Sequence, residues 1–197
     1  MNHNFKKNAL ILFARKLELG KVKTRLAATL GEEEALEIYG RLLGHTRTVA
    51  RVSNCDVHVF LTELIGDDFW IEFNTHQQIG LNLGQKMQHA FELVFELGYE
   101  KLIIIGSDCP GITPRHVKNA IESLNKVDVV FGPALDGGYY LMGMKQVLPR
   151  LFQEVNWSTS SVLFESLNRV EQAGKTYVLL EPLNDLDEEK DIPEEWR

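Results

Sequence analysis

The sequence has little cysteine and no long apolar run, and each shortage excludes a class of protein. Two cysteines, Cys55 and Cys109, are too few for a disulfide framework in a chain of 197 residues. We therefore expect reduced thiols and a cytoplasmic location. The longest apolar runs, 9–14 and 102–105, have the length of strands, whereas a membrane span needs about 20 apolar residues. Residues 1–7 are polar and basic, and we expect no signal peptide there.

The chain also lacks an excess of bases. Its 21 Lys and Arg residues stand against 28 Asp and Glu residues, which gives a net charge of −7. A net acidic protein repels the phosphates of nucleic acids, so we expect no nucleic-acid partner. The bases are nevertheless concentrated in one place, because residues 14–25 hold five bases and one acid. A compact basic segment in an acidic protein suits a small anion better than a polymer.

Three familiar ligand signatures are missing. The six histidines show no metal-ligand spacing, which disfavours a zinc site. A P-loop would need glycine where Arg15 stands and serine or threonine where Val22 stands. No Gly-x-Gly-x-x-Gly sequence follows the first apolar run. A nicotinamide-dependent oxidoreductase, which we keep as an alternative, therefore loses its main support.

Strand-like and helix-like segments alternate along the chain, whose length suits one domain spanning residues 1–197. Continuous apolar runs indicate strands buried on both faces, and apolar residues at helical spacing indicate helices packed on a sheet. We predict a three-layer α/β/α sandwich with a mainly parallel sheet, whose ligands bind beyond the carboxyl ends of the strands. The predicted strands are 8–14, 55–62, 101–106, 127–131, 139–144 and 176–180, with an ambiguous segment at 67–75, and the predicted helices are 31–52, 83–97, 113–124 and 158–173.

The first predicted strand runs into a basic turn that contains a glycine. Glycine lets backbone N–H groups approach a phosphate, and Lys or Arg side chains offset the phosphate charge. The candidates are Arg15, Gly20, Lys21, Lys23 and Arg25. The alternative is a solvated basic turn without a ligand, and both interpretations stay open on the residues alone.

The loop after the strand at 101–106 carries one carboxylate, Asp108, and Pro110 with Gly111 turns the chain directly afterwards. Mg²⁺ binds through one or two carboxylates plus substrate phosphates, so Asp108 is a candidate metal ligand. The alternative is that Asp108 only hydrogen-bonds the turn. Cys109 has no adjacent histidine and is more typical of a packed side chain than of a nucleophile.

Three further segments have two interpretations each. The segment Asp136–Gly138 is either a hairpin turn or a surface where bare backbone meets a sugar. Trp157, at the predicted start of a helix, is more typical of a core residue than of a ligand platform. Residues 185–191 are rich in acids. They form either a solvated turn or a segment that brings Asp187, as a second metal carboxylate, close to Asp108.

These segments occur in a fixed order along the chain: Ala14-Arg15, Gly20–Leu26, Gly106–Pro110, Asp136–Tyr140, Trp157–Thr159 and Asp185–Asp187. In that order they resemble a bacterial family of glycosyltransferase-A-like proteins, of the radical-SAM/selenodomain-associated transferase type. The family looks like part of the nucleotide-diphospho-sugar transferase superfamily, and the resemblance runs from about residue 9 to residue 192. That superfamily also contains the nucleotidyltransferases of molybdopterin dinucleotide synthesis and the guanylyltransferase of deazaflavin cofactor synthesis.

The resemblance implies a GT-A fold, a nucleoside triphosphate or nucleotide sugar, a small-molecule acceptor, and Mg²⁺ or Mn²⁺. It implies Asp108, Lys23 and Asp136 as catalytic residues, with Asp108 and Asp187 as metal ligands. The residues implied to hold the nucleotide and its phosphates are Arg15, Gly20, Lys21, Lys23, Arg25, Gly84 and Lys86, with Gln78 and residues 80–86 near the base. The residues implied to face the acceptor or sugar are Asp136, Gly137, Gly138 and Trp157.

The sequence departs from the family pattern at several positions. Leu17 stands where proline is common, and Lys86 stands where arginine is usual, with loss of bidentate geometry. Glu188 stands where threonine commonly follows the Asp-x-Asp stretch. Asp108 has no acid two positions away, unlike most glycosyltransferases, and in this respect the chain is closer to the nucleotidyltransferases.

We therefore expect a metal-dependent transferase that uses a nucleotide-activated donor. The first expectation is a glycosyltransferase-like enzyme with a nucleotide-sugar donor. The alternative is a nucleotidyltransferase that adds a nucleotide to a phosphorylated small molecule and releases pyrophosphate. A catalytically silent nucleotide-binding protein is the non-enzymatic alternative. All of these require the basic turn and Asp108 to converge in space.

Overall fold

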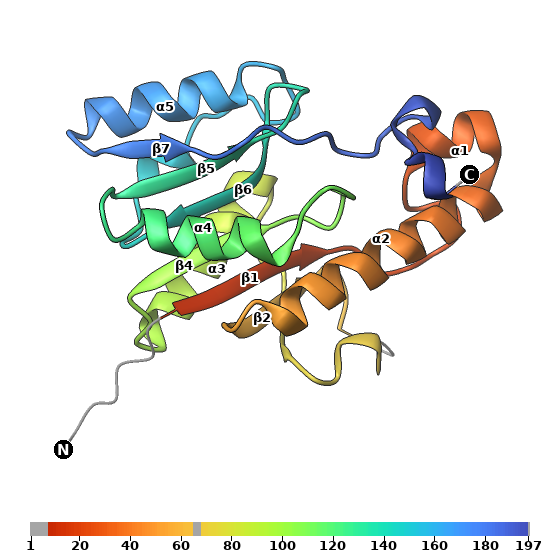
Figure 1. Ribbon diagram of the computed structural model, residues 1–197, viewed down its shortest axis with the longest axis horizontal. Coiled ribbons are helices and arrows are strands. Elements are labelled where there is room, and N and C mark those ends of the chain that lie inside the picture. Colours follow the sequence, from red (N-terminus) through yellow and green to blue (C-terminus); the bar gives the residue numbers. More distant parts are fainter. Residues whose placement is uncertain (1–7, 65–67, 197) are drawn as a thin grey trace.

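The computed structural model describes residues 8–64 and 68–196, which form one seven-stranded sheet between two layers of helices (Figure 1). The strand order is β3-β2-β1-β4-β6-β5-β7. All neighbouring strands are parallel except β6, which runs antiparallel to both β4 and β5. The predicted three-layer sandwich with a mainly parallel sheet is confirmed. Residues 1–7, where no signal peptide is expected, and residue 67 lie outside the described residues.

The bounds of the elements are as follows. The strands are β1 (Asn8–Ala14), β2 (Asp56–Leu61), β3 (Asn74–Gln77), β4 (Lys101–Ile105), β5 (Val129–Pro133), β6 (Tyr139–Met144) and β7 (Tyr177–Leu179). The α-helices are α1 (Thr24–Leu30), α2 (Glu32–Val52), α3 (Leu83–Glu96), α4 (Pro114–Ser123) and α5 (Val162–Gln172). Short 3₁₀ helices are η1 (Asp68–Trp70), η2 (Pro149–Leu151), η3 (Glu189–Asp191) and η4 (Glu194–Trp196).

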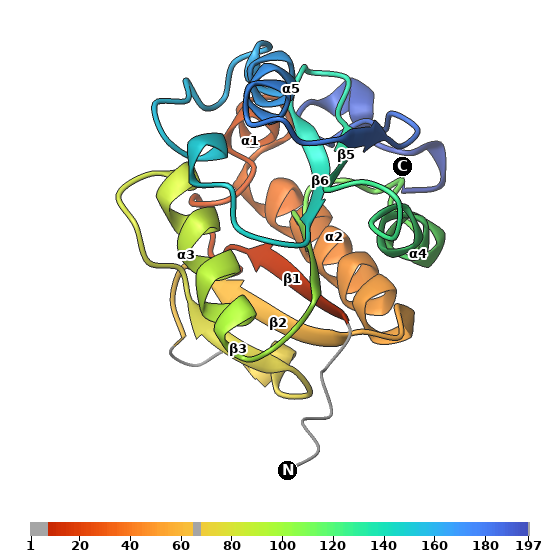
Figure 2. The ribbon, with the colours of Figure 1, turned by 90° about the vertical axis from the view of Figure 1, so that its left-hand side faces the viewer.

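Alternate residues of the central strand β1 supply the two faces of the core. Leu10 and Leu12 join the cluster that includes side chains of α1, α2 and α4, whereas Ala9 and Ile11 join the cluster that includes side chains of α3 and α5. Figure 2 looks along the layers and shows α3 on one side of the sheet and α2 with α4 on the other. This double burial accounts for the unbroken apolar run in the sequence, because side chains alternate between faces along a strand.

The structure differs from the predicted elements at two turns. Residues 24–30 form the helix α1, although the sequence places them in a basic loop. Lys23, directly before α1, has φ 46° and ψ 48°, and this left-handed residue separates turn from helix. The predicted helix start at Ser158 is wrong, because α5 begins at Val162 and Ser158 itself has φ 63°. The ambiguous segment contains η1, and β3 follows it.

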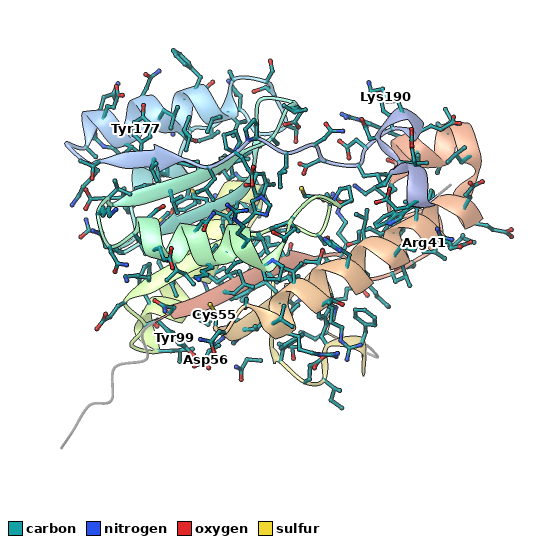
Figure 3. The ribbon with its side chains drawn as sticks, viewed as in Figure 1. Arg41, Cys55, Asp56, Tyr99, Tyr177 and Lys190 are labelled. Carbon is teal, nitrogen blue, oxygen red and sulfur yellow. The ribbon has the colours of Figure 1, made fainter. Side chains whose placement is uncertain are left out.

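The C-terminal segment returns across the sheet and ends beside α1, at one end of α2 (Figure 1). Arg41 of α2 donates a hydrogen bond of 2.9 Å to the carbonyl oxygen of Trp196. Figure 3 shows that Arg41 and Lys190 both lie at this end of the molecule, whereas Asp56 and Tyr99 lie at the opposite end. No helix within the described ranges combines the length and the apolar character needed to cross a membrane. The return of the C-terminal segment brings residues 185–187 to the loop after β4.

Candidate active site

A cleft of about 650 Å³ opens where β1, β2 and β4 end and β6 begins. Its volume is that of a typical small-molecule site, and its position at the carboxyl ends of parallel strands is the usual one for this architecture. Many polar and charged side chains line it. They include Arg15, Lys16, Glu18, Lys21, Thr62, Glu63, Gln78, Lys86, Ser107, Asp108, Ser158 and Asp185.

The ammonium group of Lys23 joins two carboxylates at the edge of the cleft. Its Nζ atom lies 2.5 Å from Oδ1 of Asp108 and 3.3 Å from Oδ1 of Asp187. The Lys23 side chain is only 6% exposed, whereas the two carboxylates are about half exposed. Arg25 reaches Asp187 less closely, with Nη1 3.5 Å from Oδ2. The basic turn, the loop after β4 and the C-terminal segment therefore meet at one point.

The segment 185–187 is held in place by its middle residue. Leu186 is fully buried in the core, and its backbone N–H donates a 2.8 Å hydrogen bond to the carbonyl oxygen of Asp108. On either side of the buried Leu186, Asp187 contacts Lys23 and the charge of Asp108 raises the pKa of Asp185, so both acids lie at the carboxylate cluster. The sequence Asp-Leu-Asp is thus an anchored pair of acids rather than a solvated turn.

Asp185 is the most perturbed acid of the site. Burial, together with the negative charges of Asp108 and Asp136, raises the pKa of Asp185 to about 7. Its Oδ1 atom is buried and has no hydrogen-bond partner within the described residues. Buried polar atoms almost always have a partner, so an unpartnered carboxylate oxygen on a cleft wall indicates a position for a ligand.

A buried tyrosine, Tyr39 of α2, contacts both the turn after β1 and the loop after β4. Its hydroxyl accepts a 2.9 Å hydrogen bond from the Arg15 N–H and lies 3.3 Å from the Arg15 carbonyl oxygen and 3.2 Å from Oγ of Ser107. Burial raises the pKa of Tyr39 to about 12, so the phenol stays protonated at neutral pH. Gln78 performs a similar task, because its Nε2 donates to the carbonyl oxygens of Ala14 and Phe60 at 3.1 and 3.0 Å.

The remaining bases on the cleft wall fall into two groups. Lys16 pairs with Glu63 at 3.3 Å, and Lys21 pairs with Glu18 at 2.8 Å. Arg15 and Lys86 line the cleft, and neither forms an ion pair with any residue of the described part of the chain. Two cations without a carboxylate partner are the groups best placed to accept an incoming anion.

Packing requires glycine at two positions that the resemblance places at the ligand. A Cβ atom at Gly84, in the first turn of α3, would lie 2.7 Å from Nε1 of Trp157 and closer still to the carbonyl oxygen of Phe152. A Cβ atom at Gly137 would lie 2.6 Å from Cα of Ser160. The backbone of Ser160 fills the space on the Cβ side of Gly137. Trp157 accordingly packs on α3.

The segment Asp136–Gly138 forms the turn between β5 and β6. Oδ1 of Asp136 accepts a 2.8 Å hydrogen bond from the Gly138 N–H, and the Gly137 N–H donates to the Ala134 carbonyl oxygen at 3.1 Å. The hairpin interpretation of this segment is therefore confirmed. Asp136 is still near enough to Asp185 for its charge to raise the pKa of that acid. The turn thus borders the carboxylate cluster.

The carboxylates suit a divalent ion that arrives together with phosphates. No group of three or more His, Cys, Asp or Glu side chains is arranged as a metal site within residues 8–64 and 68–196. Asp108 and Asp187 offer hard oxygen ligands on one side, and Mg²⁺ commonly takes one or two carboxylates and fills its other positions with water and substrate phosphates. The unpartnered oxygen of Asp185 lies close to this pair, as the effect of their charges on its pKa indicates.

Sequence reasoning misses two functional features of this site. Asp185 stands in a segment that the sequence singles out, but only Asp187 is assigned there as a ligand, because burial of the first acid depends on the whole C-terminal segment. The supporting role of Tyr39 gives no signal, since the tyrosine has the pattern of one more core residue of an amphipathic helix. An apolar helical stripe that contains a hydroxyl is the only hint that the sequence offers.

Residues 45–159 match the sequence model of a family described as an uncharacterized protein conserved in bacteria (DUF2064). That range contains Asp108 and Asp136 but neither Lys23 nor Asp187. A 2-phospho-L-lactate guanylyltransferase of Methanocaldococcus vulcanius is 29% identical over 129 residues, which are 64% of this chain and 57% of that enzyme. The chain therefore matches little more than half the length of that relative.

Solved structures share the fold. A protein of Desulfovibrio desulfuricans G20 described as a nucleotide-diphospho-sugar transferase superposes with a TM-score of 0.86 and 28% identity, covering 92% of this chain and 82% of that one. The inositol-1-phosphate CTP transferase of T. maritima superposes with a TM-score of 0.61 at 10% identity, covering 96% and 93%, and shows the fold alone. These matches confirm the expected superfamily; none of them concerns the radical-SAM association.

Proposed function

Because this chain belongs to the family described as an uncharacterized protein conserved in bacteria (DUF2064), we propose from its site that it is a metal-dependent nucleotidyltransferase acting on a phosphorylated small molecule. The observation that carries the proposal is the meeting of Lys23, Asp108 and Asp187 at one edge of the cleft. A guanylyltransferase at 29% identity supports nucleotide transfer in particular. The expected sugar-donor reaction has less support and becomes the second candidate.

Each residue of the site has a task in this proposal. Arg15 and Lys86, which lack ion-pair partners in the described chain, would bind the phosphates of the donor. Asp108 and Asp187 would hold Mg²⁺ or Mn²⁺. The chemistry that such an ion supplies is neutralisation of negative charge on the phosphates. Tyr39 would keep the two loops at a fixed separation, which is what an in-line reaction requires.

The reaction that fits these groups is a displacement at phosphorus. An oxygen of the acceptor's phosphate forms a bond to the α-phosphorus of a nucleoside triphosphate, and the bond from the α-phosphorus to the bridging oxygen breaks. Pyrophosphate leaves with that oxygen and its electron pair. Fixed cations around the phosphates stabilise the charge that develops on the leaving group. Gly20, Lys21 and Arg25, on or beside the turn after β1, would assist in binding, and Asp136 with Gly138 and Trp157 would border the acceptor.

The second candidate is glycosyl transfer from a nucleotide sugar. It is favoured by one observation, the similarity of the whole chain to a protein described as a nucleotide-diphospho-sugar transferase. The same cations and carboxylates would then stabilise a departing nucleoside diphosphate, and an acceptor hydroxyl would attack the anomeric carbon. The two candidates share the donor's phosphates and differ in the acceptor.

A thermal-shift screen separates the candidates before any acceptor is known. Nucleoside triphosphates, nucleotide sugars and NAD(P) are each added with and without Mn²⁺, because a ligand that binds the folded state raises the melting temperature. We expect stabilisation by a triphosphate that depends on Mn²⁺, followed by pyrophosphate release when small phosphorylated acids are supplied. Stabilisation by nucleotide sugars alone would favour glycosyl transfer. Binding without product from any acceptor would favour a silent nucleotide-binding protein, and stabilisation by NAD(P) alone would overturn both transferase candidates.

A further inference from the structure

The position between the carboxylates of Asp108 and Asp187 is already filled by a cation. Nζ of Lys23 contacts one oxygen of each acid, at 2.5 and 3.3 Å. The surrounding chain covers nearly all of this side chain, because Lys23 is 6% exposed. Lys23 is therefore not a free surface lysine that waits for phosphate.

The backbone of Lys23 adds an independent observation. Its φ of 46° and ψ of 48° lie in the left-handed region, which a residue with a side chain adopts only at an energetic cost. Such strain persists where the surrounding structure requires it. Here the left-handed residue is the one whose side chain reaches the two acids.

A divalent ion and this ammonium compete for the same oxygens. Mg²⁺ binds carboxylate oxygens at about 2.0–2.1 Å, which is nearer than an ammonium approaches, and two cations held by the same pair of oxygens repel each other strongly. An ion that binds the same Oδ1 atoms of Asp108 and Asp187 would therefore displace Lys23. The displaced ammonium then needs a new anionic partner, and the phosphates of a donor beside Arg15 and Lys86 would be that partner.

On the premise of the proposed function, we propose that Lys23 is a resident counter-ion. It holds the carboxylates of Asp108 and Asp187 when the site is empty, and it moves to the donor's phosphates when a divalent ion takes its place. Metal and nucleotide then bind cooperatively. The ion releases the Lys23 ammonium to pair with the phosphates, and the phosphates draw the ammonium away from the carboxylates that the ion needs. The coupling is reciprocal, so each ligand tightens the other by the same factor.

The test compares Lys23→Met with Lys21→Met. Both variants remove one positive charge from the same turn, but Lys21 pairs with Glu18 and contacts neither of the two acids. Mn²⁺ binding is titrated by calorimetry without nucleotide. We expect Lys23→Met to bind Mn²⁺ at least tenfold more tightly than the wild type, and Lys21→Met to change that affinity by less than threefold. Equal Mn²⁺ affinity in Lys23→Met and the wild type would overturn the proposal.

A GTP titration in the presence and absence of Mn²⁺ completes the comparison. In the wild type, Mn²⁺ should raise the affinity for GTP. In Lys23→Met that gain should largely disappear, and in the presence of Mn²⁺ the variant should bind GTP at least tenfold more weakly than the wild type. Lys23→Met should thus strengthen the binding of Mn²⁺ and weaken the binding of GTP. If Mn²⁺ and GTP bind to the wild type independently of each other, the counter-ion proposal fails while the nucleotide site stands. If neither ligand binds to any of the three proteins, the proposed function fails and the counter-ion proposal with it.

A measurement on the wild type alone covers the case in which Lys23→Met does not fold. An amine-acylating reagent is applied, and the modified lysines are mapped by peptide mass spectrometry. Lys23 should react slowly in the metal-free protein and several-fold faster at saturating Mn²⁺, and it should be protected again when GTP is added with Mn²⁺. Lys118 of α4, which is exposed and lies outside the cleft lining, is the internal reference. Labelling of Lys23 that ignores Mn²⁺ would contradict the displacement.

Discussion

The hydroxyl of Tyr39 lies 3.2 Å from the hydroxyl of Ser107, and this contact joins a helix to the loop that carries Asp108. The same phenol contacts the backbone N–H and carbonyl oxygen of Arg15. One buried side chain thus fixes the separation of the turn after β1 and the loop after β4. A ligand that bridges these two loops, as the proposed function requires, would depend on it.

Replacement of Tyr39 by phenylalanine tests this link. The ring and its packing stay, while the backbone N–H of Arg15 loses its partner, so we expect a loss of about 1–2 kcal/mol in the free energy of unfolding. We also expect weaker binding of a triphosphate with Mn²⁺. Denaturant titration and calorimetry measure the two effects. Ser107→Ala is the matched control, since it leaves both contacts of Tyr39 to Arg15, and nucleotide binding should fall less. A larger loss in Ser107→Ala would contradict the assignment.

Asp108→Asn removes a charge and keeps the shape of the side chain. We expect the protein to remain folded and the Mn²⁺-dependent part of nucleotide binding to fall at least about tenfold, since the carboxylate of Asp108 is one of the two proposed metal ligands. Calorimetry with and without Mn²⁺ measures this. Asp128→Asn is a control with the same change of charge, because Asp128 pairs with Lys145 and Lys175 away from the cleft wall. Unchanged binding in Asp108→Asn would refute the metal assignment.

Gly84→Ala probes the packing of α3 against Trp157. The added methyl group would overlap the carbonyl oxygen of Phe152, so we expect a destabilisation of about 1–3 kcal/mol. Gly44→Ala in α2 is the opposite case. Apart from α2's own backbone and the two neighbours of Gly44, no atom of the described residues lies within 4 Å of a Cβ built there, and alanine should stabilise the helix by up to about 1 kcal/mol. Thermal or denaturant unfolding compares the variants; equal effects at the two positions would argue against the packing role.

Glu72 gives a prediction on pH. Hydrogen bonds from Arg51, and less so from Arg47, lower the pKa of Glu72 to about 2. Because folding lowers the pKa of Glu72, its ion pairs stabilise the folded state at pH values above the ordinary pKa of glutamate. This stabilisation is lost as the pH falls toward 2. Glu72→Gln should therefore lower the melting temperature slightly at pH 7, because exposed ion pairs are weak. The difference from the wild type should shrink between pH 4.5 and 2; a difference that grows toward acid pH would contradict it.

The sequence predicts the sheet well because its strands are buried on both faces. An unbroken apolar run of strand length, such as Leu102–Ile105, is typical of a strand covered by helices on either side, and the capping residue Thr113 with Pro114 marks the start of α4 correctly. The antiparallel direction of β6 is not visible, because a buried strand has the same apolar pattern in either direction. The helix α1 is missed because Arg25 in its first turn continues the basic segment 14–25, which resembles an anion-binding turn.

The sequence predicts most charged residues of the candidate site, but it does not predict which of them pair with each other. Lys23 and Asp187 are 164 residues apart, and a pattern of charges along the chain does not reveal which lysine will be neutralised. The residue pattern alone therefore does not separate the bases of the turn, and only the family resemblance singles out Lys23. The fold separates them into three kinds: Lys23 held by two acids, Lys21 paired with Glu18, and Arg15 without an ion-pair partner in the described chain.

The antiparallel strand β6 contributes its first residues, rather than the loop after it, to the cleft. Because β6 opposes β4, with Leu141 beside Ile105, its opening residues Tyr139 and Tyr140 arrive at the border where β1, β2 and β4 finish. The cleft thus draws on the beginning of one strand and the finish of three others. A survey of relatives that inspects only what comes after each strand would overlook the tyrosines of that wall.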